Sequence, residues 1–470
     1  MLSMNILSKK DCEKIHVSSL EILNTLGVRI DHDEVYKKLC DAGARVLDNK
    51  IRLVAMSESL VKKALEDVPK KIKFCDRNGG VEEVTAKGPN LFWGGNAMFM
   101  VNGKKRELID AKNFAELTRV VDASENVHAA VGASIDGFPP GSRDFVSFKI
   151  MAENTFKHLR PVLFSATGVD AMIEMAQVLL NGKPLEENPI FSLGHSIVCP
   201  LHWSEAALGM FIKSAKYKIP VTINGEPIAG GTSPVTLAGS IALSNAEILS
   251  GIVVNQVLQK GRPCIYNLGF AHVFDMRTAI SQSASAECAL MAGAGANLAE
   301  FYNVPSASWM STEAMSVDGQ SAYEKTMNGL MHILCGTNII WGVGQLESQM
   351  TMSLEQVVID NDIIGQLKRI KRGFEVNDET IAMDVIKEVG LSGDFLSHEH
   401  TLSKYKDEFV FPDLIFRGKR DNWDKEGMKD LNERAEDKVK KILKENKKEY
   451  VTPKQKQELE KIQKTWLEKF

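Results

Sequence analysis

The stretch Val221–Ala271 decides the fold, with the sequence VTINGEPIAGGTSPVTLAGSIALSNAEILSGIVVNQVLQKGRPCIYNLGFA. Its apolar runs Val221–Glu226 and Cys264–Ala271 predict two strands. Between them, Ser233 followed by Pro234 is an N-cap with proline at the first helical position, and Gly261 ends that helix. The stretch is therefore a strand–helix–strand unit, from which parallel sheets are built.

The same alternation extends outward over residues 91–370. We expect eight strands, at Leu91–Val101, Val127–Ser134, Val162–Thr167, Ile190–Val198, Val221–Glu226, Cys264–Ala271, Pro305–Met310 and Ile339–Gln345. A helix follows each strand, beginning near Asp110, Ser142, Asp170, Ser204, Ser233, Thr278, Asp318 and Ser353. Eight such pairs predict an α/β fold of the (β/α)8 TIM-barrel type, which spans ~250 residues.

The main alternative is a doubly wound open sheet. Such a sheet usually carries a Gly-x-Gly-x-x-Gly turn after its first strand. Here the first strand is followed by Asn102–Gly103 and a basic stretch, which predicts a hairpin instead. The barrel is favoured.

Segments of different composition flank the barrel. We expect a helical N-terminal segment over residues 1–88, the TIM-barrel catalytic domain over 89–370, and a C-terminal helical extension over 371–470. The extension holds a polar loop with His398, Glu399 and His400, then a lysine-rich helical end that is broken at Pro453. Its charges are typical of a solvated helix rather than a ligand site.

Composition narrows the class of protein. The chain has 470 residues, 44% hydrophobic and 25% charged, which excludes wholesale disorder. A formal charge of −4 argues against nucleic-acid binding. No apolar run approaches the ~18 residues that span a bilayer, and the N-terminus turns charged too early for a signal peptide. We expect a cytoplasmic, enzyme-sized protein that binds neither nucleic acid nor membrane.

The cysteines support a reducing compartment. The sequence has seven of them and no Cys-x-x-Cys pair, so neither a disulfide framework nor a thiolate zinc site is expected. Buried free thiols fit better.

Aromatic rings and glycines gather at the predicted strand ends, where barrels of this type place their sites. Glycine there lets a ligand approach the backbone closely, and rings that converge on one mouth favour a quaternary ammonium ion. The plainer alternative is that these rings only pack the barrel, since strands favour aromatic residues. The rings are Trp93, Tyr266, Phe270, Trp309 and Trp341.

A metal site is the weaker hypothesis. His195, Cys199 and His202 have the side-chain types of zinc ligands, but Pro200 interrupts them, and His398 and His400 lie outside the barrel. We expect no metal, and His195 is better suited to hydrogen-bond a carboxylate or water. No Gly-x-Ser-x-Gly motif is present, so the chain offers a polar and aromatic pocket without an obvious nucleophile. This indicates that a cofactor or a partner brings the reactive group.

Several motifs resemble the trimethylamine methyltransferase family over nearly the whole chain. They are Asp11–His16 leading to Leu26–Val28, Phe92–Asn96, Asn224–Pro227, Asn338–Ser348 and Met352–Asn361. The resemblance implies a TIM barrel and, as methyl acceptor, the Co(I) corrinoid (cobalamin) of a separate partner protein. Members with pyrrolysine demethylate trimethylamine and carry that residue near Gly344–Glu347. This sequence has only standard residues there, so it resembles the non-pyrrolysine branch, which is associated with quaternary amines.

The resemblance implies roles for named residues. The five rings would surround the ammonium group, and Asn96, His195, His202 and Asn224 would bind the carboxylate of glycine betaine. Glu226 would offset the ammonium charge, with a structural ion pair as the alternative. Gln345 and Glu347 stand where the pyrrolysine branch has its special residue, so both are catalytic candidates beside Glu226.

Other readings stay open. The same reaction could act on proline betaine, carnitine or γ-butyrobetaine, since sequence does not measure the width of a pocket. The chain could instead be a betaine-binding or sensing protein without catalysis, or a metal-dependent barrel hydrolase. Helical extensions on barrels often make assemblies, so a homo-oligomer is expected.

Overall fold

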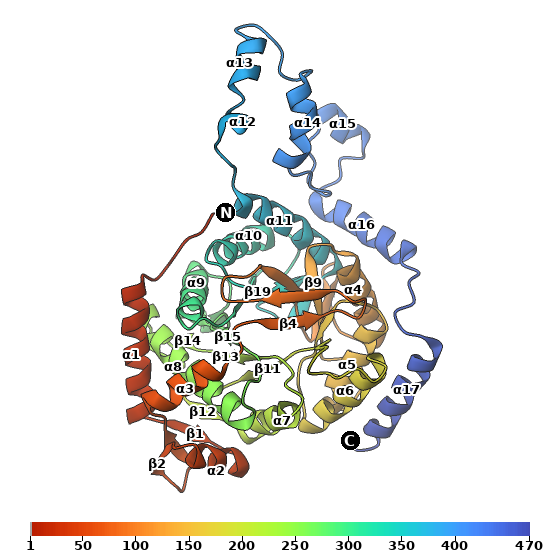
Figure 1. Ribbon diagram of the computed structural model, residues 1–470. Helices are drawn as coiled ribbons and strands as arrows, with labels where there is room; N and C mark the ends of the chain where they lie inside the picture. Colours follow the sequence, from red (N-terminus) through yellow and green to blue (C-terminus); the bar gives the residue numbers. More distant parts are fainter. Residues whose placement is uncertain (1) are drawn as a thin grey trace.

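The computed structural model describes residues 2–470 and has an eight-stranded parallel barrel at its centre (Figure 1). Neighbouring strands follow chain order, and a bridge between Leu159 and Phe191 joins the two end strands of the sheet. The predicted TIM-barrel fold is therefore confirmed. The barrel strands are β6 (Leu91–Gly94), β9 (Val127–Val131), β10 (His158–Arg160), β11 (Leu193–Ser196), β13 (Val221–Asn224), β15 (Cys264–Asn267), β18 (Ser306–Trp309) and β19 (Ile339–Val343).

Helices cover the outside of the barrel, and the main core lies between them and the strands. Five of the predicted helix starts are N-caps in the structure, at Asp110, Ser142, Ser204, Asp318 and Ser353. The helices are α4 (Ala111–Ala123), α5 (Arg143–Ala152), α6 (Ala166–Leu179), α7 (Glu205–Ala215), α8 (Leu237–Leu258), α9 (Ala286–Phe301), α10 (Gly319–Leu334) and α11 (Leu354–Arg372), with a 3-10 turn η1 (Pro140–Ser142).

Three other helix starts were wrong. Ser165 and Thr236 are the N-caps of α6 and α8, in place of Asp170 and Ser233. Around Thr278 the chain forms a hairpin, and α9 begins later, after its N-cap Ser285. A small sheet that includes this hairpin lies beyond the ends of β13 and β15; its strands are β14 (Ile228–Ala229), β16 (His272–Asp275) and β17 (Ile280–Gln282).

The third barrel strand was also misplaced. The apolar pattern predicts it at Val162–Thr167, whereas the strand is β10, His158–Arg160. The prediction followed apolar residues, but here the inward positions are His158 and Arg160, and Pro161 follows directly. Polar residues therefore point into the barrel at this place.

Helix α8 contradicts the expectation that no stretch is long and apolar enough to span a membrane. An 18-residue window of this helix has a mean hydropathy of 1.6, which meets that test by length and composition alone. In the structure 72% of the window is buried, and α8 packs against α1 (Lys9–Thr25) and α3 (Glu58–Asp67). The polar residues Asn245, Glu247 and Asn255 interrupt the apolar run, and each is hydrogen-bonded in the core.

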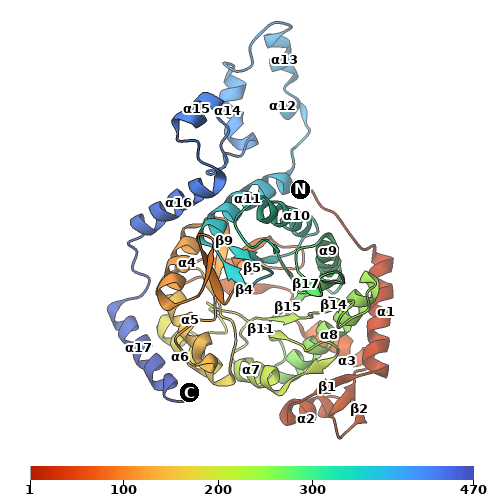
Figure 2. The same ribbon diagram turned by 180° about the vertical axis from the view of Figure 1, so that it is seen from behind.

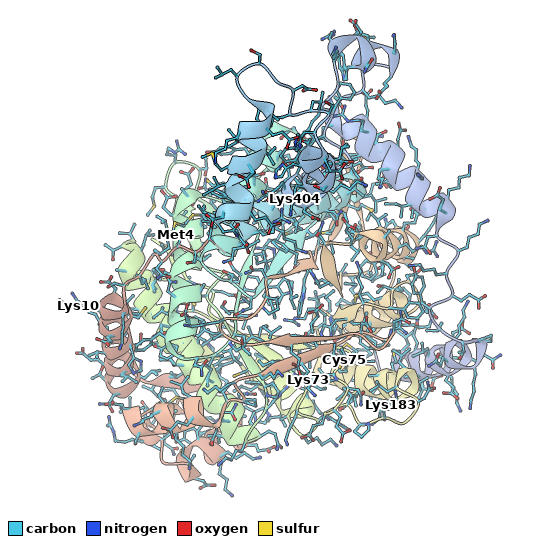
Figure 3. The ribbon with its side chains drawn as sticks, turned by 45° about the horizontal axis from the view of Figure 1, so that its top comes forward. Met4, Lys10, Lys73, Cys75, Lys183 and Lys404 are labelled. Carbon is cyan, nitrogen blue, oxygen red and sulfur yellow. The ribbon has the colours of Figure 1, made fainter. Side chains whose placement is uncertain are left out.

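The N-terminal segment contains strands as well as the three expected helices. The third helix is α2 (Asp33–Asp41). The strands β1 (Val28–Ile30), β2 (Arg45–Asp48) and β3 (Leu53–Ala55) form a sheet with β12 (His202–Trp203). The hairpin of β4 (Ile72–Cys75) and β5 (Val81–Val84) then crosses the amino end of the barrel. Figure 3 shows β4 there, with Lys73 and Cys75.

This hairpin is a plug. Its side chains Ile72, Phe74 and Val84 are almost fully buried and belong to the inner core with Leu91 and Ile339 from the barrel strands. Apolar side chains of the hairpin thereby pack across the amino end of the barrel. A smaller cavity remains beside the hairpin, between Phe74, Trp93 and His158.

Shorter strands and the C-terminal extension complete the chain. Near the carboxyl end of the barrel lie β7 (Phe99–Asn102), β8 (Lys105–Leu108), β20 (Gln345–Leu346) and β21 (Thr351–Met352), where β7 and β8 form the expected hairpin. Figures 1 and 2 both show α12–α15 projecting beyond α11, clear of the barrel. The helices are α12 (Asp378–Ile381), α13 (Met383–Val389), α14 (Glu399–Glu408), α15 (Arg420–Lys425), α16 (Leu431–Glu445) and α17 (Pro453–Leu467).

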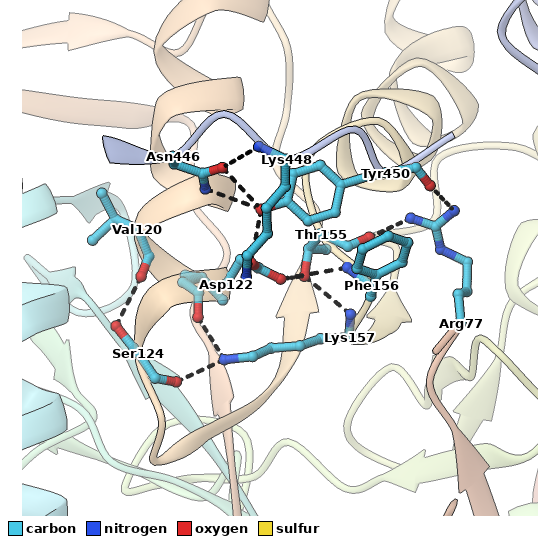
Figure 4. Close-up of polar contacts among 11 residues, drawn as sticks. Arg77, Val120, Asp122, Ser124, Thr155, Phe156, Lys157, Asn446, Lys448 and Tyr450 are labelled. Carbon is cyan, nitrogen blue, oxygen red and sulfur yellow. Dashed lines mark hydrogen bonds and ion pairs between the residues drawn. The ribbon is translucent and has the colours of Figure 1, made fainter. Parts of the chain in front are cut away.

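The extension returns to the barrel through a polar cluster centred on Asp122 (Figure 4). Tyr450 donates its hydroxyl hydrogen to Asp122 at 2.7 Å, and Thr155 donates to the other carboxylate oxygen at 2.8 Å. Arg77, next to the plug, donates to backbone carbonyls of Thr155 and Tyr450. The link between α16 and α17 is thus fastened to both the barrel wall and the plug.

Candidate functional site

A cavity of about 350 Å3 opens at the carboxyl ends of the barrel strands. Its wall combines aromatic rings, a carboxylate and a guanidinium group with small residues. The lining residues are Asn96, Val131, Arg160, Pro161, Val162, Leu163, Gly194, His195, Ser196, Ala207, Met210, Asn224, Glu226, Phe270, Trp309 and Trp341. Six of the residues that the sequence analysis proposed for substrate binding and one of its catalytic candidates are among them.

Three rings form one side of the cavity. Trp309 and Trp341 occupy inward positions on the adjacent strands β18 and β19, and their rings are stacked with centroids 5.1 Å apart. Phe270 packs against Trp309 at 4.5 Å. Such contacts hold the rings in fixed orientations, and the faces they offer attract cations.

Gln345 fixes the position of Trp309. Its side chain is fully buried, and its Oε1 accepts a hydrogen bond from the indole Nε1 of Trp309. Its Nε2 donates to the backbone carbonyl of Asn96 on the facing loop. Gln345 therefore lies behind the ring wall and orients it.

A buried ion pair supports the same strand from behind. Lys325 on α10 donates to Asp360 on α11 at 2.8 Å and to the carbonyl of Gly342. Asp360 in turn accepts from the amide of Gly344 at 2.7 Å. Gly342 and Gly344 have φ of 107° and 86°, so this irregular end of β19 needs glycine at both places.

Glu226 is the acidic group of the cavity. Ser196 Oγ donates to its Oε1 at 2.5 Å, Asn224 Nδ2 donates to Ser196 Oγ, and Asn267 Nδ2 donates to Asn224 Oδ1. Burial raises the pKa of Glu226 above its ordinary value. Asn224 is thus committed to a network that orients Glu226, although it also lines the cavity.

Arg160 is the basic group, and the sequence analysis missed it. It lies at the end of β10, and burial lowers its pKa to about 9. Its guanidinium carbon lies 5.6 Å from the ring centroid of Trp341. The signal that could have found it is Arg160–Pro161, a charged residue where a barrel strand must end.

Three predicted substrate-binding residues lie away from the cavity. Trp93 sits deeper in the barrel against Phe74 and His158, because its strand position faces the plug. Tyr266 faces outward and donates its hydroxyl hydrogen to Asn245 on α8. His202 belongs to the sheet with the N-terminal segment and contacts Asp31 at 2.5 Å.

Two further candidates have other surroundings than expected. His195 borders the cavity, but its ring packs against Phe211 at 4.2 Å, and neither ring nitrogen has a hydrogen-bond partner within the described chain. Burial and the charges of Arg262 and Arg160 hold its pKa well below the ordinary value. Glu347 lies on the loop after β20, where it pairs with Arg106 at 2.7 Å.

The residues considered as metal ligands do not converge. Cys199 donates its thiol hydrogen to Glu247, and burial beside that carboxylate raises the thiol pKa. His398 is the N-cap of α14 and not part of a loop. Within residues 2–470 no group of three or more His, Cys, Asp or Glu side chains is arranged to hold a metal ion. The seven cysteines are free thiols.

A parallel barrel with a polar and aromatic cavity at the carboxyl ends of its strands is the architecture of barrel enzymes. The chain belongs to the trimethylamine methyltransferase family, whose model matches residues 1–465. Members of this family methylate a corrinoid protein.

Individual relatives are similar over most of their length. A trimethylamine methyltransferase of Methanosarcina barkeri (strain Fusaro) is 31% identical over 463 residues, which cover 96% of this chain and 92% of the relative. A glycine betaine methyltransferase of Desulfitobacterium hafniense (strain Y51) is 31% identical over 450 residues, 93% and 92% of the two chains. The crystal structure of the Methanosarcina barkeri monomethylamine methyltransferase matches with a TM-score of 0.53 at 14% identity, over 92% of this chain and 94% of that one. This last likeness concerns the fold.

Proposed function

We propose that this chain moves an N-methyl group from a quaternary amine to the corrinoid of a partner protein. The best candidate substrate is glycine betaine, which would leave as dimethylglycine. The observation that carries the proposal is one cavity in which Glu226 and the rings of Phe270, Trp309 and Trp341 lie together. A buried carboxylate and aromatic faces are the groups that hold a methylated ammonium ion.

The choice of a quaternary amine has separate support. Residues 344–347, where the pyrrolysine branch has its special residue, are Gly, Gln, Leu and Glu. One of the relatives with 31% identity is named a glycine betaine methyltransferase. Proline betaine, carnitine and γ-butyrobetaine remain alternatives for the same reaction.

The residues of this chain would hold the substrate so that one methyl group points out of the cavity. A Co(I) corrinoid on the partner would supply the nucleophile that accepts the methyl group. Positioning of this kind lowers barriers by up to ~7–11 kcal/mol. The substrate's positive charge disappears as the methyl group leaves, so attraction to Glu226 and the rings that is too strong would favour the ground state. Ser196 donates a hydrogen bond that stabilises the charged form of Glu226 without adding a charge of its own.

Exposed apolar side chains at the carboxyl end of the barrel support docking of a partner protein. Nearly every loop that follows a barrel strand exposes one such side chain, and we call this set the apolar rim. Its residues are Met98, Phe164, Val198, Val235, Met276, Met315 and Met350. Methionine adapts to different contacts, which suits a partner that docks and leaves in each cycle.

We also propose that the protein acts in the cytoplasm, where its free thiols would stay reduced. A homo-oligomer is proposed because the projecting part of the extension, residues 374–430, has a single buried residue, Leu414. We call this part the lobe. The large apolar side chains of the lobe would be exposed to solvent in a monomer. A second copy of the chain is the partner that is always available to cover them.

The test is a methyl-transfer assay with the purified protein and reduced corrinoid protein or free Co(I) cobalamin, followed by the visible spectrum of the corrinoid. Glycine betaine, proline betaine, carnitine, γ-butyrobetaine and trimethylamine are offered separately. We expect methylation with a quaternary amine and none with trimethylamine. No methylation with any of the five amines, while a control enzyme methylates the same corrinoid, would refute the proposal. Binding of a betaine without transfer would favour a sensing protein.

A further inference from the structure

Arg160 is a charged group in the cavity. Methyl transfer from an ammonium ion does not by itself require a positive charge at this place. Arg160 points inward from β10, and its surface that is not covered by protein lines the cavity. An ammonium ion alone would gain nothing from a guanidinium group nearby, because the two charges repel each other. The presence of Arg160 in the cavity therefore indicates a second, negatively charged group on the ligand.

The hydrogen bonds of Arg160 leave its charge without an acidic partner. Nη1 donates to the carbonyls of Pro161 at 3.2 Å and Ser192 at 3.5 Å, and Nη2 donates to Thr222 Oγ1 at 3.1 Å. Nε is buried and has no partner among the described residues. No aspartate or glutamate of residues 2–470 forms an ion pair with it, Glu226 included.

The barrel wall is shaped around this guanidinium group. A Cβ atom on Gly194 would lie 1.9 Å from Nη2, so glycine at this position of β11 makes the space that Arg160 occupies. The ring of Trp341 lies beneath the guanidinium carbon at 5.6 Å. The group is thus held in one place by neighbours on three strands, with its donors fixed.

A buried charge without an oppositely charged partner destabilises the folded protein. Such a charge is typical of a functional site, where a bound ligand supplies the partner. We infer that Arg160 binds the carboxylate of the substrate, so that the cavity takes zwitterions with a carboxylate near β10 and a methylated ammonium group near Glu226. A guanidinium group forms charge-assisted hydrogen bonds with carboxylates, and Nη2 keeps one hydrogen that its bond to Thr222 does not use. The inference rests on the proposed function and narrows its substrate class to carboxylates.

The first test compares Arg160→Gln, Arg160→Lys and the unchanged protein in the methyl-transfer assay. Glycine betaine is the zwitterion, and tetramethylammonium is the analogue without a carboxylate. We expect Arg160→Gln to raise KM for glycine betaine about 100-fold, in line with a lost charge-assisted hydrogen bond and a lost charge partner. Arg160→Lys should recover only part of this. Turnover of tetramethylammonium should stay equal or improve in both variants.

Arg262→Lys is the matched control, since Arg262 is a fully buried arginine of the barrel region that does not line the cavity and donates to Ile219, Phe211 and Ser214. We expect a lower melting temperature and an unchanged preference between the two substrates. An Arg160→Gln variant that loses both substrates equally, or that retains its KM for betaine, would overturn the inference.

Calorimetric titration with glycine betaine and dimethylglycine separates this inference from the proposed reaction. If no variant transfers a methyl group but both zwitterions bind and the binding requires Arg160, the reaction is wrong and the carboxylate site stands. If betaine is demethylated equally well without Arg160, the reaction stands and the carboxylate site is wrong.

Discussion

Glu226 owes its place in the cavity to a chain of amides and hydroxyls. Asn267 holds Asn224, Asn224 holds Ser196, and Ser196 donates to Glu226, so three strand ends cooperate to orient one carboxylate. The charge of such a group depends on pH, because burial raises its pKa. Protonation would remove the attraction for a substrate cation.

Replacement of Glu226 by Gln should weaken the binding of glycine betaine by about 10- to 100-fold, because a buried charge partner is lost. In the unchanged protein, affinity should fall as the pH is lowered through the raised pKa of Glu226. In Glu226→Gln that pH dependence should be absent. Titration calorimetry between pH 5 and 8 measures both effects. An equal pH dependence in the two proteins would assign it to another group.

Replacement of Gln345 by Met should lower kcat/KM at least tenfold and cost about 1–3 kcal/mol of unfolding free energy. The buried indole N–H of Trp309 would lose its acceptor, and an unsatisfied buried donor costs about that much. Denaturant unfolding and the methyl-transfer assay measure the two effects. Gln455→Met on α17 is the control for activity, since its bonds to the backbone of α6 and within the capping box of α17 lie far from the cavity. Full activity in Gln345→Met would contradict a positioning role.

At the scale of elements, the end of β19 shows how a strand is bent to serve the site. The pairing of β19 with β6 shifts register between Ile340 and Val343; Gly342 lies within this shift, and Gly344 follows it, both with positive φ. The Lys325–Asp360 pair ties α10 and α11 to this bend from outside the barrel. The rings that line the cavity thus depend on helices that never contact a substrate.

Replacement of Lys325 by Met should cost about 3–5 kcal/mol of unfolding free energy, since it leaves Asp360 charged and buried without its partner. The double variant Lys325→Met, Asp360→Asn should recover much of this, because Asn keeps an acceptor for the amide of Gly344. Urea unfolding measures both. Lys213→Met breaks the exposed pair with Asp170 and should cost less than about 1 kcal/mol. A double variant no better than the single one would contradict this account.

The sequence predicted elements best where apolar patterning and caps agree. β13, β15, β18 and β19 lie within their predicted ranges, and helices with strong N-caps begin where expected. Prediction failed at β10 because its inward residues are polar: Arg160 lines the cavity, and His158 lies deeper in the barrel. It failed at β16 and β17 because a hairpin and a helix start share the same short polar signals.

The candidate site was predictable only in part. Strand-end residues such as Glu226, Trp309 and Trp341 could be named because a barrel fixes where strands end. The sequence does not show which face of a strand a residue occupies. Tyr266 and Trp93 were therefore predicted to line the cavity, although their side chains lie elsewhere. Arg160 was lost together with the strand that carries it.

At the scale of the whole molecule, the lobe stands apart from the barrel in both ribbon views. Its helices α12–α15 have no buried residue, and apolar side chains such as Phe374 and Leu396 are each 79% exposed. Interfaces between permanent partners are rich in such residues. The lobe is therefore where we place contacts between copies.

The unchanged protein should sediment as a dimer or larger assembly. The triple variant Phe374→Glu, Leu396→Glu, Phe411→Glu should sediment as a monomer with the same far-UV circular dichroism, because these side chains support no core of their own. Sedimentation velocity measures this. Val17→Glu, on the exposed face of α1, is the control that should leave the assembly intact. A monomeric unchanged protein would contradict the assignment.

The hairpin of β4 and β5 has a consequence for the order of events. Because it packs across the amino end of the barrel, the cavity at the strand ends opens toward the carboxyl end, and we call this opening the doorway. Under the proposed function, the amine enters, the demethylated amine leaves and the acceptor protein docks at that same doorway. The amine must then load before the acceptor docks, and the product must wait until it departs. Turnover should therefore pass through a maximum as the acceptor concentration rises, because excess acceptor closes the doorway of the empty enzyme.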